Sequence, residues 1–275
     1  MNAAFDDPSS FASAAAGDGA VPPSAPDRRF TGVARLYGAD GLARLRAARV
    51  AVVGLGGVGS WAVEALARSG VGHLTLIDLD HVSESNINRQ SHALDSTVGA
   101  AKAAVLATRV ADIDPRCAVD AIEDFVDAGN VAALLPAGRF DHVIDAVDDV
   151  RAKIVLVAHC RAHGIPLVTV GGAGGRTDAS RVRVTDLAET RHEPMLAKVR
   201  KTLRARHAFP PDGGAPFGVA AVFSDYPRGA DDGGGEGRDG TTGLHCAGFG
   251  SVVAVTAVFG FVAAGTAIDR LARGR

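Results

Sequence analysis

The sequence predicts an α/β fold built on a doubly wound, mostly parallel sheet. Short apolar runs that do not alternate are typical of strands buried on both faces of a parallel sheet, and residues 50–53 form such a run. Runs of this kind alternate with helical stretches over residues 49–170. The first run leads directly into Gly54, Gly56 and Gly59, which have G-x-G-x-x-G spacing. Together these features are typical of a Rossmann-like nucleotide-binding core.

The 275-residue chain is long enough for one large α/β domain or two small ones. Residues 1–27 are mostly small or polar and lack periodicity, which predicts a disordered tail. We expect residues 28–275 to form a single domain with its nucleotide-binding core at 49–175. The C-terminal part, 176–275, is expected to serve substrate binding or dimer formation. Within that part, the glycine-rich and acidic stretch 229–243 predicts a flexible loop.

Charge and cysteine content narrow the range of functions. The formal net charge is −2, so there is no global attraction to nucleic acid and any basic patch has to be local. Cys117, Cys160 and Cys246 are far apart and odd in number, which argues against a disulfide framework and fits a reducing, cytoplasmic location. The sequence contains no C-x-x-C pair, which excludes a structural zinc site of that kind.

The first two thirds of the chain are predicted as a regular alternation of helices and strands. Helical stretches have apolar residues spaced three or four apart, and strands are short apolar runs. Pro115 and Pro136 mark helix ends, because proline cannot continue a helix. The predicted helices are 30–48, one starting near Ser60, 99–110, 126–135 and 151–163. The predicted strands are 49–53, 73–77, 117–122, 140–146 and 165–170.

After Gly175 the pattern changes. Residues 181–185 alternate with period two, which predicts a half-exposed antiparallel strand and hence an antiparallel C-terminal extension of the sheet. Residues 193–207 are predicted to form a helix with an apolar side. Two interpretations of its basic faces stay open, a solvated surface and a contact with nucleic acid. The cations concerned are Lys198, Arg200, Lys201, Arg204 and Arg206.

The segment 247–268 is open to two interpretations. Its 22 residues carry no charge and are long enough to span a bilayer. However, 13 of them are Ala, Gly, Ser or Thr, so the hydrophobic drive for insertion is weak. We favour a helix and strand buried in the core or in a dimer interface. A membrane-associated protein anchored through this segment is the alternative.

Several polar residues are expected to meet at a nucleotide site. Gly54, Gly56, Gly57 and Gly59 let the backbone approach a phosphate, and the helix that follows directs free N–H groups towards that anion. Asp78 ends the strand 73–77 and lies about 20 residues beyond the last glycine, where a carboxylate can bind ribose hydroxyls. The glycine loop alone does not distinguish NAD, FAD and ATP.

A longer set of polar residues agrees in order and spacing with one group of enzymes. The set comprises the Gly-x-Gly-Gly-x-Gly loop, Asp78-x-Asp80, Asn86-x-Asn88-Arg89-Gln90, Lys102 and Asp145-x-x-Asp148. In these residues the chain resembles the adenylating superfamily related to ubiquitin-activating enzymes. The match covers roughly residues 29–185. It implies that the chain binds ATP with Mg²⁺ and that it forms a homodimer, as its relatives do.

Within that superfamily the chain is most similar to the family of tRNA threonylcarbamoyladenosine dehydratases. The segments that carry this similarity are 34–38, 88–94, 166–169, 171–175, 182–187, 246–250 and 256–261. The resemblance implies that the substrate is tRNA with a threonylcarbamoylated adenosine beside the anticodon. It also implies the reaction: the free carboxylate becomes an acyl-adenylate, a nitrogen of the same side chain attacks it, AMP leaves and a ring closes with net loss of water.

The chemistry of the residues supports adenylation. Joining a carboxylate to the α-phosphate of ATP requires neutralised charge and reactants held in line. We expect Arg89 and Lys102 to supply the cations and Asp148 to hold Mg²⁺, a hard cation that prefers oxygen ligands. These three are the predicted catalytic residues. Asp80 is expected near the same site, and Asn86 is expected to donate to phosphate.

Two departures from the superfamily pattern affect the predicted partners. Members that serve sulfur carrier proteins usually hold zinc with two C-x-x-C pairs, and the lack of these pairs counts against a carrier-protein substrate. Their N-terminal Arg-Gln, which reaches the neighbouring subunit's ATP, has no match around Phe30, so Arg29 and Arg35 are the candidates for that role. Cys246 is either a buried small side chain, which we favour, or an additional site residue that accepts sulfur from a relay protein.

Three alternatives to the dehydratase stay open. The first is an adenylyltransferase for a ubiquitin-like sulfur carrier protein. The second is an NAD-dependent oxidoreductase or a non-catalytic dinucleotide-binding module, although it leaves Asp80, Asn86, Arg89 and Lys102 without a role. The third is a membrane-tethered form of the enzyme.

Overall fold

The computed structural model describes residues 28–226 and 250–275. The described chain forms a seven-stranded sheet of order β3-β2-β1-β4-β5-β7-β6. All neighbouring strands are parallel except β6, which is antiparallel to β7 at one edge. The strands are β1 (Arg49–Val53), β2 (His73–Ile77), β3 (Ala118–Ile122), β4 (His142–Asp145), β5 (Leu167–Val170), β6 (Val182–Asp186) and β7 (Ala220–Ser224). The predicted α/β fold with an antiparallel C-terminal strand is confirmed.

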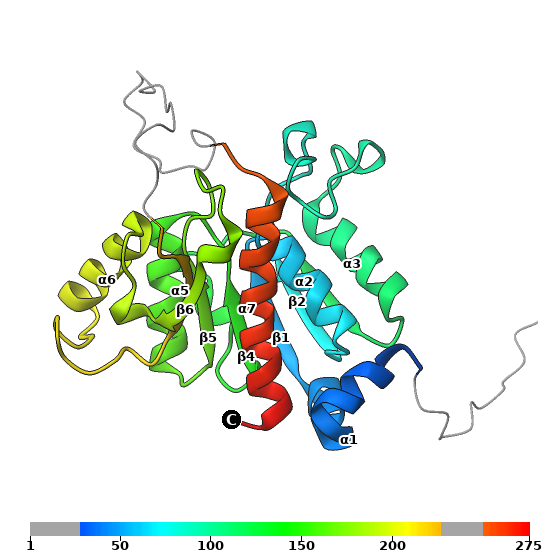
Figure 1. The fold of residues 1–275 in the computed structure, drawn as a ribbon, viewed down its shortest axis with the longest axis horizontal. Coiled ribbons are helices and arrows are strands. Elements are labelled where there is room, and N and C mark those ends of the chain that lie inside the picture. Colours follow the sequence, from blue (N-terminus) through cyan, green and yellow to red (C-terminus); the bar gives the residue numbers. More distant parts are fainter. Residues whose placement is uncertain (1–27, 227–249) are drawn as a thin grey trace, which may run out of the picture.

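Helices cover both faces of the sheet (Figure 1). One apolar core lies between the sheet and α1, α2, α3 and α7, and a second lies between the sheet and α4, α5 and α6. Val50 and Val52 of β1 belong to the first core and Ala51 and Val53 to the second, which explains why the β1 sequence is apolar without alternation. The helices are α1 (Thr31–Ala47), α2 (Gly59–Arg68), α3 (Lys102–Ile113), α4 (Val131–Leu134), α5 (Val150–Ala162), α6 (Pro194–Arg206) and α7 (Val253–Arg273).

One predicted helix is shorter in the structure, and one strand of the structure was not predicted. The helix predicted at 126–135 is reduced to the single turn of α4. Before it, Asp127 accepts the backbone N–H groups of Gly129 and Asn130, and Asn130 accepts that of Asp127. Such local side-chain bonds compete with helix formation. The second difference is β7, which lies in a segment where no element was predicted.

The segment 247–268 was predicted as a helix and a strand, and this prediction is wrong for its described part. Residues from Val253 onwards form the single helix α7, which crosses in front of the sheet beside α2 (Figure 1). Among the described residues, α7 alone is long and apolar enough to cross a membrane, yet half of its most apolar window is buried inside the protein. Its small residues let it pack closely on α2, which favours the core interpretation over the membrane anchor.

Three predictions fall outside the described residues: the disordered tail at 1–27, the flexible loop at 229–243 and the role of Cys246.

Two glycines of α7 provide a matched test of this packing. A Cβ at Gly260 would lie 2.4 Å from the carbonyl oxygen of Val58 and 2.9 Å from Cβ of Trp61, whereas a Cβ at Gly265 would meet nothing within 4 Å. We expect Gly260→Ala to lower the free energy of unfolding by about 2 kcal/mol, because the clash exceeds the gain in helix propensity. Gly265→Ala should raise it by about 0.5–1 kcal/mol. Urea unfolding of both variants checks this, and equal effects would contradict the packing described.

Candidate functional site

A cleft of about 570 Å³ opens at the carboxyl ends of the parallel strands. β1 has β2 on one side and β4 on the other, so the direction in which successive strands are added to the sheet reverses at β1. Ligands of open α/β sheets bind at such a point. Each predicted catalytic residue, Arg89, Lys102 and Asp148, lines this one cleft. It is also lined by Gly54, Gly56, Gly57, Asp78, Asp80 and Asn86.

The glycines of the first loop are required for different structural reasons. Gly54 turns the chain with φ +84°, and a Cβ there would lie 2.8 Å from the backbone nitrogen of Val147. Gly59 brings α2 against this turn, because a Cβ on it would lie 1.8 Å from the carbonyl oxygen of Gly54. A Cβ on Gly56 would meet only Gln90, at 4.0 Å. Gly56 therefore keeps the cleft side of the loop open, while Gly59, which does not line the cleft, maintains the packing that shapes it.

These roles predict opposite outcomes for two alanine substitutions. Gly59→Ala should lower the free energy of unfolding by about 3 kcal/mol or more, since neither backbone can move without distorting β1 or α2. Gly56→Ala should change stability by less than about 0.5 kcal/mol but weaken ATP binding about tenfold, or about 1.4 kcal/mol, because the methyl group occupies the cleft.

Chemical denaturation and ATP titration measure the two effects separately. The assignment of roles fails if Gly56→Ala loses stability and retains ATP binding.

Asp78 and Lys102 lie at the end of β2. One carboxylate oxygen of Asp78 accepts the backbone N–H of Leu55 and the other accepts that of Asp80, which ties the glycine loop to β2. Burial is the largest influence on this carboxyl group and raises its pKa. Lys102 is buried at the start of α3, and its Nζ lies 2.7 Å from Oδ2 of the exposed Asp80. Asp80 therefore holds the ammonium group at the rim of the cleft.

Arg89 and Asn86 belong to the loop between β2 and α3. The guanidinium of Arg89 donates to the carbonyl of Ser85 and to Oδ1 of Asn88, at 2.8 and 2.9 Å. The indole of Trp61 donates to the Arg89 carbonyl at 2.9 Å, which anchors the loop to α2. The side-chain oxygen Oδ1 of buried Asn86 accepts a hydrogen bond from the backbone N–H of Ser83. This bond does not use the side-chain NH₂ group, which is the group expected to donate to phosphate.

The two carboxylates of Asp145-x-x-Asp148 have separate environments. Asp148 is exposed and lines the cleft. Asp145 is fully buried at the end of β4 and forms an ion pair with fully buried Lys153 of α5, at 2.8 Å. Thr169 of β5 donates to the other oxygen of Asp145 at 2.6 Å. Asp145 therefore joins β4, β5 and α5 beneath the turn that carries Asp148, and it does not contact the cleft.

Removal of Lys153 tests the buried ion pair. Lys153→Met leaves the Asp145 carboxylate buried without its cation, so we expect a loss of about 3–5 kcal/mol in the free energy of unfolding. The double variant with Asp145→Asn removes both charges and should recover most of that loss. Unfolding of the wild type, Lys153→Met, Asp145→Asn and the double variant forms a double-mutant cycle. A double variant no more stable than Lys153→Met alone would disprove the coupling.

From the sequence, no individual role was assigned to several groups in and below the cleft. In the sequence Lys153 looks like an ordinary lysine of a helix, because its partner Asp145 belongs to a different element. Gln90 and Thr256 line the cleft, and within the described chain their buried Oε1 and Oγ1 atoms have no hydrogen-bond partner. Buried polar atoms normally find partners, so both fit a site that holds a polar ligand. The loop 171–174 and Phe125 complete the wall.

The described carboxylates of the cleft do not form a protein-bound metal centre by themselves. The described residues contain no group of three or more His, Cys, Asp or Glu side chains arranged to hold a metal. Mg²⁺ commonly takes only one or two protein carboxylates and completes its shell with phosphate oxygens and water. Asp148 provides one such carboxylate. Asp149 caps α5 by accepting the N–H of Ala152 at 2.8 Å.

Comparison with known proteins assigns the chain to a family. The ThiF family matches residues 29–273. The chain belongs to the ThiF family. This agrees with the resemblance seen in the glycine loop and in the Asp, Asn, Arg and Lys motifs, all of which lie within the matched range.

Two ThiF relatives are similar over nearly their whole length. The tRNA threonylcarbamoyladenosine dehydratase of Haemophilus influenzae is 45% identical over 250 residues, which are 89% of this chain and 94% of the relative. The enzyme of the same name from Escherichia coli is 46% identical over 260 residues, 89% and 93% of the two chains.

A solved structure gives the same result for the fold. The structure of Escherichia coli tRNA N6-threonylcarbamoyladenosine dehydratase in complex with ATP matches with a TM-score of 0.80 and 45% identity, covering 90% of this chain and 94% of that one.

Proposed function

We propose that this ThiF chain is an ATP-dependent dehydratase that adenylates the carboxylate of threonylcarbamoyladenosine in tRNA and cyclises it. One observation carries the proposal: Arg89, Lys102 and Asp148, which come from three distant parts of the chain, line a single cleft. The similarity to dehydratases over about nine tenths of the chain, one of them solved with ATP, supports the same reaction and substrate.

Each residue has a proposed role in the first step. Asp78 accepts hydrogen bonds from ribose hydroxyls, and the N-terminal end of α2 with the loop at Gly56 faces the phosphates. Arg89 and Lys102 neutralise the triphosphate as its charge shifts in the transition state. Asp148 would hold Mg²⁺, which would supply positive charge beside the phosphates.

The reaction balances with a nucleophile already present in the substrate. A carboxylate oxygen forms a bond to the α-phosphorus of ATP and pyrophosphate leaves. A nitrogen of the same side chain then attacks the activated carbonyl carbon and releases its proton to solvent, and AMP leaves with the oxygen that the substrate loses. Tethering of the nucleophile makes this second step effectively unimolecular, which favours it strongly.

We extend the proposal to a homodimer in the cytoplasm. Phe261 of α7 and Leu36 of α1 are large apolar side chains with 44% and 75% of their surface exposed, and a contact between two copies of the chain would cover such surface. A sulfur-relay partner acting through Cys246 stays a prediction from the sequence.

A carrier-protein adenylyltransferase is the second candidate. The molybdopterin-synthase adenylyltransferase of Escherichia coli is 39% identical, but the similarity covers only 50% of this chain and 54% of that enzyme. Such an activity would give ATP–pyrophosphate exchange only with a carrier that ends in Gly-Gly.

The proposed reaction is tested with threonylcarbamoylated tRNA and Mg-ATP. We expect AMP formation and a nucleoside lighter by about 18 Da, one water, because the ring closes by acyl transfer. Asp148→Ala should reduce kcat by about 100-fold or more, as expected for removal of a group that stabilises transition-state charge. Asp149→Ala removes a neighbouring carboxylate of the cleft whose Oδ1 caps α5, at a cost of about 1 kcal/mol, and should keep most activity because that oxygen is already engaged.

Nucleoside mass spectrometry and AMP release are the readouts. Binding of NAD in preference to Mg-ATP, or exchange that depends on a carrier protein, would refute the dehydratase.

A further inference from the structure

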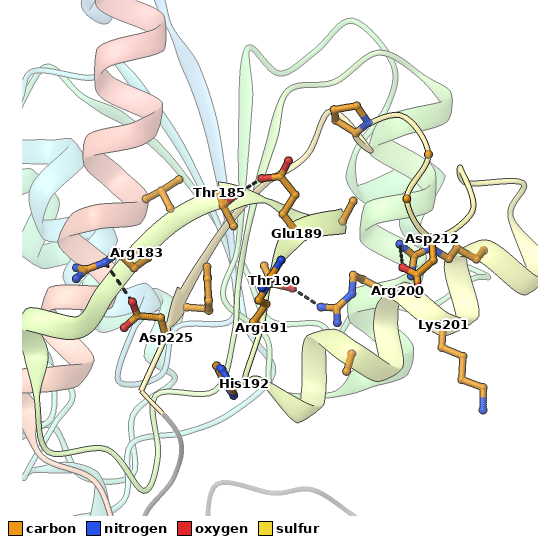
Figure 2. Close-up of a pocket in the computed structure, with 18 of the residues that line it drawn as sticks. Arg183, Thr185, Glu189, Thr190, Arg191, His192, Arg200, Lys201, Asp212 and Asp225 are labelled. Carbon is orange, nitrogen blue, oxygen red and sulfur yellow. Dashed lines mark hydrogen bonds and ion pairs between the residues drawn. The ribbon is translucent and has the colours of Figure 1, made fainter.

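A second and larger concavity lies between β6, the turn after it, α6 and the loop that follows α6 (Figure 2). Its volume is about 1560 Å³, whereas pockets for small molecules usually measure about 300–1,000 Å³. We call it the basic groove, after the cations that line it: Arg181, Arg183, Arg191, Arg200, Lys201 and Arg204. Its size and lining suit part of a macromolecule better than a metabolite.

The carboxylates of the basic groove are already engaged. Only Glu189, Asp212 and Asp225 oppose the six cations among the described lining residues. Asp225 pairs with Arg181 and Arg183 at 2.8 and 3.4 Å, and Asp212 pairs with Arg204 at 2.7 Å. Glu189 accepts a hydrogen bond from Thr185 at 2.7 Å. Figure 2 shows Asp225 and Asp212 at opposite sides of the groove, with Arg191 and Arg200 between them, and Glu189 beside Thr185.

Two cations of the basic groove have no bonding partner. Arg191 and Lys201 are exposed, and the described residues give neither side chain a hydrogen bond or an ion pair; Figure 2 draws Lys201 extended away from α6. Arg200 donates to the hydroxyl of Thr190. Burial, and then the charge of Arg204, lower the pKa of the Arg200 guanidinium. The chain as a whole has a formal net charge of −2, so this concentration of cations is local.

The basic groove adjoins the nucleotide cleft through a short segment. Arg191 and His192 line the groove, while Met195 lines the cleft. Between them, buried Glu193 accepts the N–H of Gly172 in the cleft wall at 3.2 Å. Arg176 also donates both to the carbonyl of Gly172 and to that of His192. The wall of the cleft and the edge of the groove are therefore joined by hydrogen bonds.

The structure separates the five cations that the sequence placed on α6. Arg200, Lys201 and Arg204 line the groove, and Lys198 and Arg206 do not. Arg204 is also held in place by the carbonyl of Pro210 and by the Phe217 ring. If the basic side of α6 were only a solvated surface, there would be no reason for cations of β6 and of the 187–192 turn to gather with it around one concavity. Guanidinium and ammonium groups gathered in a groove suit a chain of phosphates.

We propose that the basic groove binds the phosphate backbone of the tRNA whose modified adenosine is presented to the nucleotide cleft. The inference rests on the proposed function, because only a polynucleotide substrate must extend beyond a cleft that holds one nucleoside and ATP. Arg191 and Lys201 contact phosphates directly, and Arg200 adds charge from the floor. An acidic protein at the same surface is the rival outcome.

Two double variants of equal charge change test the proposal. Arg191→Ala with Lys201→Ala removes the unpaired cations of the groove, and Lys198→Ala with Arg206→Ala removes two from the same region outside it. Binding of full-length threonylcarbamoylated tRNA is measured as a function of NaCl concentration. We expect the groove variant to bind about tenfold more weakly at ~0.1 M salt, with the slope of log K against log salt reduced by about 1.4–1.8.

Three controls separate groove binding from other effects. The second double variant should bind tRNA like the wild type, ATP affinity should stay unchanged in both, and Lys201→Arg should retain tRNA binding. Equal weakening by both double variants would attribute the effect to net charge and overturn the groove. Unchanged tRNA binding by the groove variant would also overturn the proposal. This includes the case in which the groove variant loses only the binding of polyglutamate, which serves as a probe for an acidic polypeptide.

The proposed reaction can fail independently of the groove. A wild-type protein that binds the tRNA through Arg191 and Lys201 without releasing AMP or changing the nucleoside would refute the dehydratase and leave the groove supported. If the protein dehydrates the tRNA and the groove substitutions do not change tRNA binding, the dehydratase is supported and the groove is refuted.

Discussion

The first turn of α2 is held between two backbones that approach it without intervening side chains. On the sheet side, Gly59 lets α2 lie against the carbonyl of Gly54 at the end of β1. On the other side, Gly260 lets α7 lie against the carbonyl of Val58. A Cβ at either position would collide with main chain, which cannot rotate away as a side chain can. The cleft depends on this double contact, because it fixes where the N–H groups at the start of α2 point.

Charged groups in and below the cleft are oriented by neighbouring protein groups. Asp80 positions Lys102, Ser85 and Asn88 position Arg89, and Lys153 anchors Asp145 under the turn of Asp148. Preorganised charges of this kind cost little reorganisation when charge develops on a substrate. A polar cleft held in this way is consistent with chemistry that depends on positioning and electrostatics more than on covalent help from the protein.

The cleft and the basic groove differ in how their charges are used. In the cleft, Lys102 and Arg89 already have protein partners within 2.9 Å, so their positions are defined before a nucleotide arrives. In the groove, Arg191 and Lys201 lie free on the surface. Exposed cations without protein partners suit a backbone that is recognised by charge along its length, whereas fixed cations suit a reaction with one required geometry.

The sequence by itself determined the fold class, the strand with its glycine turn and the residue types of the cleft. Such features are local, since an apolar run, a glycine spacing and an acid at a strand end each report the backbone around them. The tertiary structure alone decided that Asp145 is buried with Lys153, that β7 completes the sheet, that 253–273 is one helix and that only three cations of α6 enter the basic groove. Those outcomes depend on partners distant in the chain, and the spacing of neighbouring residues carries no information about them.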